Sequence, residues 1–490
     1  MTDAANDSRA RILRGPLAWE TFRFGFPLAL GMALQTTFNL VDAWLVSHLG
    51  AEEVSAAVGA MGICDQLTAV GTIVAYGVST ATATRLSQAV GRPAETEELR
   101  KQNQDDAART AGQSLLIIGV LSLLFAVVGW GGSGFLVRTI IGAKGAVADV
   151  AEATMRIMIG GSFSIFFLLH LTTMQRALGA SKTPVSMLVL GNAINVALAV
   201  VFIFGDTESA PYLAWGRPIA RLLHVPRLGM IGAAWATVLA RSVVLLPTVL
   251  VLVARWKDLL QRKYLVPISK ELRVLLSLAW PSSAQFVVRI AAMLVLHSIV
   301  ARNFTTATDQ TATVAMGLVF RPDTMVLFVA MGWGSAAQTF VGFHVGAGDF
   351  ARAKRAAGML AAWDVLTNVA LAYAFIRYGG ALLGVFCKEP APIALGMRYL
   401  VTVAPAYLPL GLAIVLANGL AGAGETRLTF SLDLLVLLLA ELPLCLLLGA
   451  TPDGLFRGLA LANGVLGAVY LVVFLRGRWL PSHGARPEVA

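Results

Sequence analysis

The sequence predicts an all-α integral membrane protein, with twelve membrane-spanning helices in two halves of six. Composition is the first observation behind this prediction: 57% of the 490 residues are hydrophobic and only 13% are charged, and the mean hydropathy is +0.73. Soluble domains carry about 25% charged residues, so a soluble chain this apolar could not cover its own surface. The other two observations are the spacing of the apolar stretches and a repeat within the chain.

Composition and motifs also exclude several classes of protein. The cysteines Cys64, Cys387 and Cys445 lie far apart and in no CxxC or Cys/His spacing, which excludes a disulfide scaffold and a zinc site. The chain contains no GxxxxGK[ST] phosphate loop, the usual mark of a nucleotide-driven motor. The first residues, MTDAANDSRARILRG, lack the apolar core of a cleaved signal peptide. We therefore expect no metal and no cofactor, and insertion that begins at the first span.

Apolar stretches long enough to cross a bilayer, which takes about 20 residues, follow one another along the chain. Those of the first half lie at 25–48, 54–88, 110–130, 150–178, 184–205 and 229–254. Those of the second half lie at 274–300, 312–345, 354–377, 393–420, 428–449 and 455–475. Many exceed the thickness of a bilayer, and several contain proline, so tilted and bent helices are expected.

The most polar linker divides the chain into two lobes. We expect a cytoplasmic N-terminal segment (1–24), an N-lobe of six spans (25–254), a cytoplasmic linker (255–273), a C-lobe of six spans (274–475) and a cytoplasmic tail (476–490). The other conspicuous polar stretch, 91–109, is expected to be a solvated helix or a linker.

The basic residues of the loops predict the orientation. Loops on the side of the N-terminus hold about 23 Lys and Arg residues, whereas the opposite loops hold about 9. Because basic loops stay in the cytoplasm, both termini are predicted to be cytoplasmic. The net charge of +10 then follows from topology, and we expect a lipid bilayer as the partner and no nucleic acid.

An internal repeat relates the two halves. Phe26-Pro27 opens the first span and Trp280-Pro281 opens the seventh. The second and eighth spans end in RLSQAVGR (85–92) and FVGFHVGA (340–347), and the fourth and tenth end in QRALGASKT (175–183) and NGLAGAGET (418–426). Such internal symmetry is typical of transporters built from duplicated bundles. Six spans separate the repeats, so the repeats are parallel and related by an axis along the membrane normal.

Four segments resemble the MATE (multidrug and toxic-compound extrusion) family. They are FNLVDAWLVSHLGAEEVSAAVGA (38–60), RALGASKTP (176–184), GMIGAAWATVLAR (229–241) and QTFVGFHVGAGDFARAKRAAG (338–358). Each motif is weak alone because small residues are common in membrane helices, but four in order on a duplicated chain are fairly specific. The resemblance covers nearly the whole chain.

The resemblance implies a fold and a function. Two pseudo-symmetric six-helix bundles would face a central cleft that opens alternately to each side of the membrane. The expected function is export of small organic compounds, drug-like and amphipathic, in exchange for protons or Na⁺. We expect an antiporter and not an enzyme, a monomer, and a location in the cell inner (plasma) membrane.

Asp42 is the strongest candidate for the coupling site. It lies deep in the first span, and Asn39 and Gln35 precede it by three and seven residues, which puts the three side chains on one helical face. Charges at membrane depth are costly and usually functional, and such a carboxylate can bind and release a proton. Asp42 also matches the acidic residue that carries coupling in the family. The alternative is a structural carboxylate bonded to a neighbouring helix end.

The fifth and sixth spans supply further candidates. Asn192 and Asn195 share one face, and the resemblance assigns Asn195 and Thr237 to the site around Asp42. Family members with an acidic cluster there have an aspartate where this chain has Ala199. Because a hard cation prefers several oxygen ligands whereas one carboxylate binds a proton, the substitution favours proton coupling. Asn192 is assigned to the substrate cavity with Gln35 and Asn39, although such amides also join helices.

The C-lobe departs from the family's pattern. One branch of the family has a glutamate where this chain has Arg289 and an aspartate where it has Leu410, so the sodium site of that branch is expected to be absent. Arg289 is a fixed charge assigned to the substrate cavity, with Asp323 as its expected counter-ion. The alternative is a static salt bridge, whereas a substrate-facing arginine would favour anionic or zwitterionic cargo.

Other charges and other functions receive less weight. Arg241 is expected to reach the lipid headgroups, and Asp433 to snorkel or to pair with the adjacent lobe. A lipid-linked precursor flippase of the same superfamily is the alternative function, but it predicts more spans or more basic residues around the cavity. A membrane enzyme would need an acid-base constellation at the interface, and a channel would need repeated filter loops; neither pattern is present.

Overall fold

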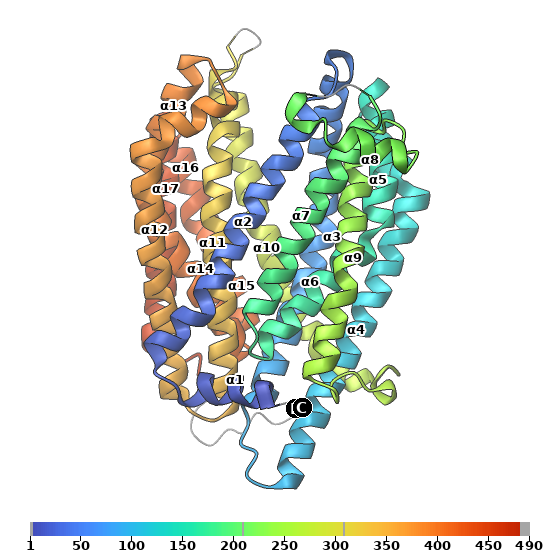
Figure 1. Ribbon diagram of the computed structural model, residues 1–490. Helices are drawn as coiled ribbons and strands as arrows, with labels where there is room; N and C mark the ends of the chain where they lie inside the picture. The colour runs from blue at the N-terminus through green and yellow to red at the C-terminus, as the bar shows by residue number, and fades with distance from the viewer. Residues whose placement is uncertain (1–2, 208–209, 307–308, 481–490) are drawn as a thin grey trace.

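The computed structural model describes residues 3–207, 210–306 and 309–480, apart from the side chains at 3–6, 36–40, 51–52, 55, 58, 294 and 301, and it is almost entirely helical (Figure 1). Ten of its helices are long and apolar enough to cross a membrane, and the bent pair α5 (Gly145–Gly160) and α6 (Ser162–Ala177) makes an eleventh span. Helix α2 (Leu17–Ser47) has 31 residues, which exceeds the length of a span. With α2, the described chain has the twelve spans that the sequence predicts.

The six spans of the N-lobe follow the predicted apolar stretches closely. They are α2, α3 (Ala51–Gly91), α4 (Glu97–Gly134), the bent pair α5 and α6, α7 (Lys182–Phe204) and α9 (Gly229–Arg255). A π-helical turn, η1 (Phe135–Ile140), extends α4, and η2 (Pro211–Leu213) and the short α8 (Gly216–Leu222) join α7 to α9.

The six spans of the C-lobe repeat this order. They are α10 (Ser269–Asn303), α11 (Thr311–Gly346), α12 (Phe350–Phe386), α13 (Pro390–Val403) with η4 (Ala404–Ala406) and α14 (Tyr407–Ala423), α15 (Thr426–Val436) with η5 (Leu437–Glu441) and α16 (Leu442–Leu448), and α17 (Pro452–Arg476). The short η3 (Arg262–Tyr264) lies in the linker between the lobes.

The fourth and tenth spans are interrupted in both lobes. The N-lobe span bends by 43° between α5 and α6, and the C-lobe span passes through η4, which contains Pro405. Both spans also end in a glycine turn, where Gly179 and Gly424 adopt φ values of +88° and +102°. Only glycine takes this conformation without strain, so the repeated turns seen in the sequence have the same backbone role.

The polar stretch 91–109 is largely the first turns of α4 and not a separate loop. The Thr96 side chain accepts a hydrogen bond from the Leu99 backbone N–H at 3.2 Å, which caps the helix. Lys263 of the linker donates to Asp105 at 3.1 Å and thereby lowers the pKa of that carboxyl. The helix therefore continues beyond the apolar stretch because its cap and its charges are satisfied in water.

The N-terminal segment also folds as a helix, α1 (Asp3–Arg14). Arg9 donates to the carbonyl oxygens of Val90 and Arg92, each at 2.7 Å, and thus holds the end of α3. Arg352 at the start of α12 donates to the carbonyl oxygen of Gly15. We call this end of the molecule the α1 end and the opposite end the far end. The segment joins both lobes at the α1 end, where the last helix α17 also terminates (Figure 1).

The lobes meet through two symmetric helix pairs, α2 against α11 and α10 against α3, and through α3 against α11. Helix α2 crosses the molecule obliquely from beside α12 at the α1 end to beside α7 at the far end (Figure 1). The first, second, seventh and eighth spans therefore border the interface between the lobes.

Close contacts between the lobes gather toward the α1 end. One face of α3 bonds the C-lobe: Thr84 donates to the Ala421 carbonyl at 2.8 Å and Gln88 donates to the Gly422 carbonyl at 3.0 Å. In return, Gln338 of α11 donates to the Thr80 carbonyl at 2.9 Å. We call these contacts, with the approach of Gly91 to Phe343, the seal. The lobes are therefore closed against each other at the α1 end.

A methyl group at Gly91 is expected to open the seal. A Cβ there would lie 2.1 Å from the carbonyl oxygen of Phe343, and overpacking of this kind costs about 2 kcal/mol. Gly91→Ala should therefore lower the midpoint of thermal unfolding in detergent. Gly464→Ala is the control, because a Cβ at Gly464 in α17 meets nothing within 4 Å. Equal melting of the two variants would show that the approach of α3 to α11 is not tight.

Candidate functional site

Asp42 and Asn195 form the centre of the N-lobe site. The Asn195 amide donates to both carboxylate oxygens of Asp42, at 2.8 and 2.9 Å. Asp42 lies in the far half of α2, and Asn195, on α7, is 6% exposed. The described residues contain no ion pair to Asp42 within 4.0 Å. The hydrogen-bond partner of this carboxylate is thus neutral, so the carboxylate can gain a proton without breaking an ion pair.

The other predicted residues of this site are only partly brought together. Asn192 donates to Gln35 at 3.3 Å, which makes a second polar link between α7 and α2. Thr237 donates to the Ala233 carbonyl of its own helix at 2.9 Å, and it makes no described hydrogen bond to Asp42. The side chain of Asn39 lies outside the described part of the structure.

Two charged residues that the sequence analysis did not assign to this site act on it electrostatically. Arg241 lies near the middle of α9, and its charge interacts with both Asp42 and Asp65 of α3. The expectation that Arg241 reaches the headgroups is therefore wrong, because its counter-charges lie within the lobe. Asp65 supplies a second carboxylate although position 199 is alanine. Asp65 could have been found from the sequence, because it is an acidic residue within the apolar stretch 54–88.

In the C-lobe, Arg289 pairs with a different carboxylate from the one expected. Its Nε donates to Oδ2 of Asp433 at 2.8 Å. Asp433 lies on α15 and its side chain is 3% exposed. The predicted counter-ion, Asp323, is engaged elsewhere, so that prediction is wrong. The expectation that Asp433 snorkels or pairs with the other lobe is also wrong.

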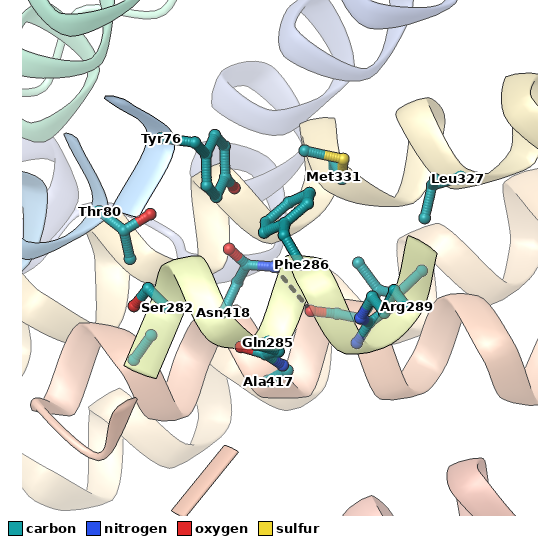
Figure 2. A pocket seen from close by; sticks show the side chains of 12 residues that line it. Tyr76, Thr80, Ser282, Gln285, Phe286, Arg289, Leu327, Met331, Ala417 and Asn418 are labelled. Carbon is teal, nitrogen blue, oxygen red and sulfur yellow. Dashed lines mark hydrogen bonds between the residues drawn. The ribbon is translucent and has the colours of Figure 1, made fainter. Parts of the chain in front are cut away.

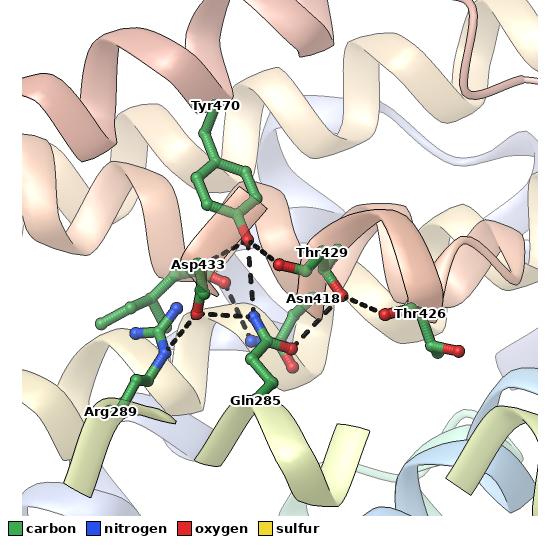
Figure 3. A network of polar contacts seen from close by, with 8 residues as sticks. Gln285, Arg289, Asn418, Thr426, Thr429, Asp433 and Tyr470 are labelled. Carbon is green, nitrogen blue, oxygen red and sulfur yellow. Dashed lines mark hydrogen bonds and ion pairs between the residues drawn. The ribbon is translucent and has the colours of Figure 1, made fainter. Parts of the chain in front are cut away.

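Asp433 is the centre of a satisfied buried network (Figure 3). Gln285 donates to its Oδ2 at 3.0 Å and Tyr470 donates to its Oδ1 at 2.6 Å. Thr429 in turn donates to the Gln285 side-chain oxygen at 3.3 Å. Three helices, α10, α15 and α17, are thereby joined around one neutralised ion pair. Charge-assisted hydrogen bonds of this kind fix the geometry of a buried pair.

Asp323 accepts hydrogen bonds from two tyrosines. Tyr399 donates to its Oδ2 at 2.5 Å, and Tyr407 donates to its Oδ1. Both tyrosines are 1% exposed. Asp323 therefore lies within the C-lobe and does not face Arg289. Among the described residues, no group of three or more His, Cys, Asp or Glu is arranged to hold a metal ion.

A small cavity lies between the lobes beside Arg289 (Figure 2). Tyr76 of α3 and Phe286 of α10 meet edge to face across it, with ring centroids 4.4 Å apart. Gln285 and Asn418 add polar groups to its wall. Its volume is about 30 Å³, enough for a water molecule or two and too small for an organic substrate. It lies where the closed seal begins.

Comparisons with known proteins agree on one family. The family model named MatE matches residues 27–201 and 289–447. The chain is 25% identical over 472 residues to the "Probable multidrug resistance protein YpnP" of Bacillus subtilis, with 93% of this chain and 94% of the relative covered. It is 23% identical over 457 residues to an "FAD transporter" of Shewanella oneidensis, with 93% and 92% covered.

Solved structures with the same fold are also found. A MOP superfamily transporter from Pyrococcus furiosus matches with a TM-score of 0.81 at 20% identity, over 98% of each chain. An outward-facing multidrug resistance MATE family transporter matches with a TM-score of 0.81 at 21% identity, over 96% of this chain and 97% of that one. At these identities the likeness concerns the fold.

The Asp433 network predicts a double-mutant result. Asp433→Asn leaves the Arg289 charge buried without its partner and should destabilise the protein by about 3 kcal/mol. Arg289→Gln combined with Asp433→Asn removes both charges and should recover most of that loss. Thermal unfolding of the single and double variants measures the coupling. Additive losses would contradict a direct pairing of the two side chains.

Proposed function

Because the chain belongs to the MatE family, we propose that it exports small organic compounds by alternating access, in exchange for protons bound at Asp42. The family and fold make it a multi-pass membrane transporter of small molecules and not an enzyme. The observation that carries the coupling proposal is the neutral partner of Asp42. A carboxylate locked by an arginine would keep one charge, whereas a carboxylate held by an amide can exist in both protonation states.

Protonation of Asp42 would change the contact between α2 and α7. When ionised, Asp42 accepts two hydrogen bonds from the Asn195 amide, and these bonds are strengthened by the negative charge. Addition of a proton removes that charge and weakens the link. Helix α2 also packs against α11 of the other lobe, so a shift of α2 would change the packing between the lobes. This is the proposed route from proton binding to conformational change.

The closed seal supports one half of the transport cycle. The lobes are bonded at the α1 end through α3, α11 and α14, so cargo would leave toward the far end in this state. Transport requires a second state in which these bonds break and the far end closes. We propose that proton exchange at Asp42 biases the equilibrium between the two states.

Na⁺ is the second candidate for the coupling ion. Asp65 provides the second carboxylate that the sequence lacked at position 199, and hard cations favour such sets of oxygens. Arg241, whose charge acts on both carboxylates, opposes this, because it already neutralises one of the two. One bound proton then brings the three groups to zero net charge. We therefore retain the proton as the proposed ion.

Drug-like amphipathic compounds are the proposed cargo, in line with relatives named multidrug resistance proteins. An anionic compound is the second candidate, in line with the relative named an FAD transporter. Arg289 supports the latter only through its place in the wall of the interlobe cavity, because its charge is already paired with Asp433. A lipid-linked precursor remains the alternative cargo.

Uptake into inverted vesicles with an imposed proton gradient tests this function. Cationic dyes and organic acids are compared with and without Na⁺. Proton-driven accumulation of any of these compounds supports the proposal. Accumulation of none of them, with movement of a lipid-linked precursor, would support the flippase instead.

The membrane location and orientation are also proposed: a cell inner (plasma) membrane with both termini in the cytoplasm. A C-terminal reporter that works only in the cytoplasm should be active, because α1 and the end of α17 share one end of the molecule (Figure 1). The same reporter inserted after Leu222, at the end of α8, should be inactive. The reverse pattern would invert the assignment of the two sides.

Loss of the titratable group at Asp42 should abolish coupling. Asp42→Asn keeps the size and one of the two acceptor oxygens but cannot bind the proton, so transport driven by a pH gradient should be lost while expression and folding persist. Asn195→Ala and Thr237→Ala should weaken coupling less. Asp149→Asn, which alters an exposed carboxylate of α5, is the matched control. Undiminished transport by Asp42→Asn would move the coupling site, with Asp323 the next candidate.

A further inference from the structure

Helix α12 carries a buried carboxyl that the proposed function does not use. Asp364 and Asn368 lie one helical turn apart, and both side chains are 0% exposed. The Asn368 amide donates to Oδ2 of Asp364 at 2.9 Å. No ion pair to Asp364 occurs among the described residues. Among the described residues, Asp364 is thus a fully buried acidic side chain whose one hydrogen-bond donor is a neutral amide.

Two oxygen atoms of this pair have no partner. Oδ1 of Asp364 and Oδ1 of Asn368 are both buried and accept no hydrogen bond from the described residues. An ionised carboxylate left in this condition would be very costly in the interior. A proton on Oδ1 of Asp364 removes the charge and turns that atom into a hydrogen-bond donor. The side-chain oxygen of Asn368, which has no other partner, is then available as the acceptor.

The charged groups on the neighbouring helices do not compensate Asp364. Helix α12 packs against α2, α11, α13 and α14, and also against η4, the turn that precedes α14. Their titratable and charged groups are Glu20, Arg23 and Asp42 on α2, Arg321, Asp323 and His344 on α11, Arg398 and Tyr399 on α13, and Tyr407 on α14. None of them exerts a charge interaction on Asp364. Within α12, Arg355 and Arg377 lie more than two turns away.

Helix α14 closes directly over the pair. A Cβ at Gly411 would lie 2.2 Å from Oδ2 of Asp364 and 2.2 Å from Nδ2 of Asn368, so only glycine permits this approach. Farther along the same helix, Ala421 and Gly422 accept the hydrogen bonds of the seal from α3. One rigid helix therefore connects the buried carboxyl to the contact between the lobes.

We propose that Asp364 is a second proton-binding site, in the C-lobe, which is protonated and enclosed while α14 is docked on α12. Without this proton the carboxylate is charged, and its burial against α14 becomes too costly for α14 to dock on α12 and close the seal. The enclosed state cannot exchange its proton with water, so exchange occurs only after α14 has moved. The binding of the proton is independent of the proposed function, and only its role in transport rests on it.

Infrared spectroscopy of the purified full-length protein tests proton binding directly. The carbonyl band of a protonated carboxylic acid should be present at neutral pH and should lose intensity in Asp364→Asn. Asp349→Asn is the matched control, because Asp349 caps the same helix at an exposed position and asparagine caps equally well. It should keep the full band. A band of equal intensity in Asp364→Asn and the wild type would overturn the proposal.

Asn368→Ala provides a second readout if Asp364→Asn does not fold. It keeps the acid and removes its hydrogen-bond partner, so the same band should shift to higher frequency. An unshifted band would mean that the acid and the amide do not form the proposed pair.

A transport measurement tests the link to the seal. Gly411→Ala should reduce proton-driven uptake about tenfold, the effect of a coupling free energy of ordinary size, whereas Gly384→Ala on α12, where a Cβ meets nothing within 4 Å, should not. Equal uptake by the two variants would refute the role of α14. If the wild type shows no proton-driven uptake, the proposed function fails, while the infrared result still decides the proton site.

Discussion

The absence of water from the membrane interior is the constraint on which the rest of this structure depends, because every buried charge must find its partner within the protein. The chain meets this requirement in different ways. Asp433 is paired with Arg289 and accepts two further hydrogen bonds, so its charge is fixed. Asp42 and Asp364 have only amides as hydrogen-bond partners. We propose that Asp42 and Asp364 are the carboxyls that bind and release a proton.

The contacts within the C-lobe and the contacts between the lobes differ in whether they contain charge. The Arg289–Asp433 network joins α10, α15 and α17 within one lobe through a charged pair. The seal, in contrast, is made of neutral hydrogen bonds and of close approaches between small residues, such as Gly91 against Phe343. The same end also carries ion pairs between the lobes, from Arg85 on α3 and Arg109 on α4 to Glu271 on α10, whereas the seal itself contains no charge. An interface of this kind is suited to opening and closing.

The fold was largely predictable from the sequence, whereas the partners of the polar residues were not. Apolar length determines the spans, and glycine turns mark their ends, so the twelve spans and the repeat were confirmed. The stretch 91–109 was expected to be a solvated helix or a linker, because a capped, charged helix in water carries no apolar signal, and the structure shows that it is helical from Glu97. The spacing of Asp42 and Gln35 correctly placed both on the face of α2 that meets α7.

The pairing errors have one physical origin. Helical periodicity tells which face a residue occupies, but it does not tell which helix packs against that face. Asp323 was expected near Arg289, yet tyrosines of α13 and α14 enclose it. The expectation that Arg241 reaches the headgroups placed it near the end of its span, whereas it lies near the middle of α9. Its counter-charges, Asp42 and Asp65, come from helices distant in the sequence.

The central claim is that proton occupancy selects between a state closed at the α1 end and a state open there. The distance between spin labels at Glu98 on α4 and Arg355 on α12, both exposed at the α1 end, tests it without any substrate. The native cysteines are first replaced. The account predicts two distances whose populations shift between acidic and alkaline pH in the wild type and do not shift in Asp42→Asn. A single distance at every pH, or an equal shift in Asp42→Asn, would contradict it.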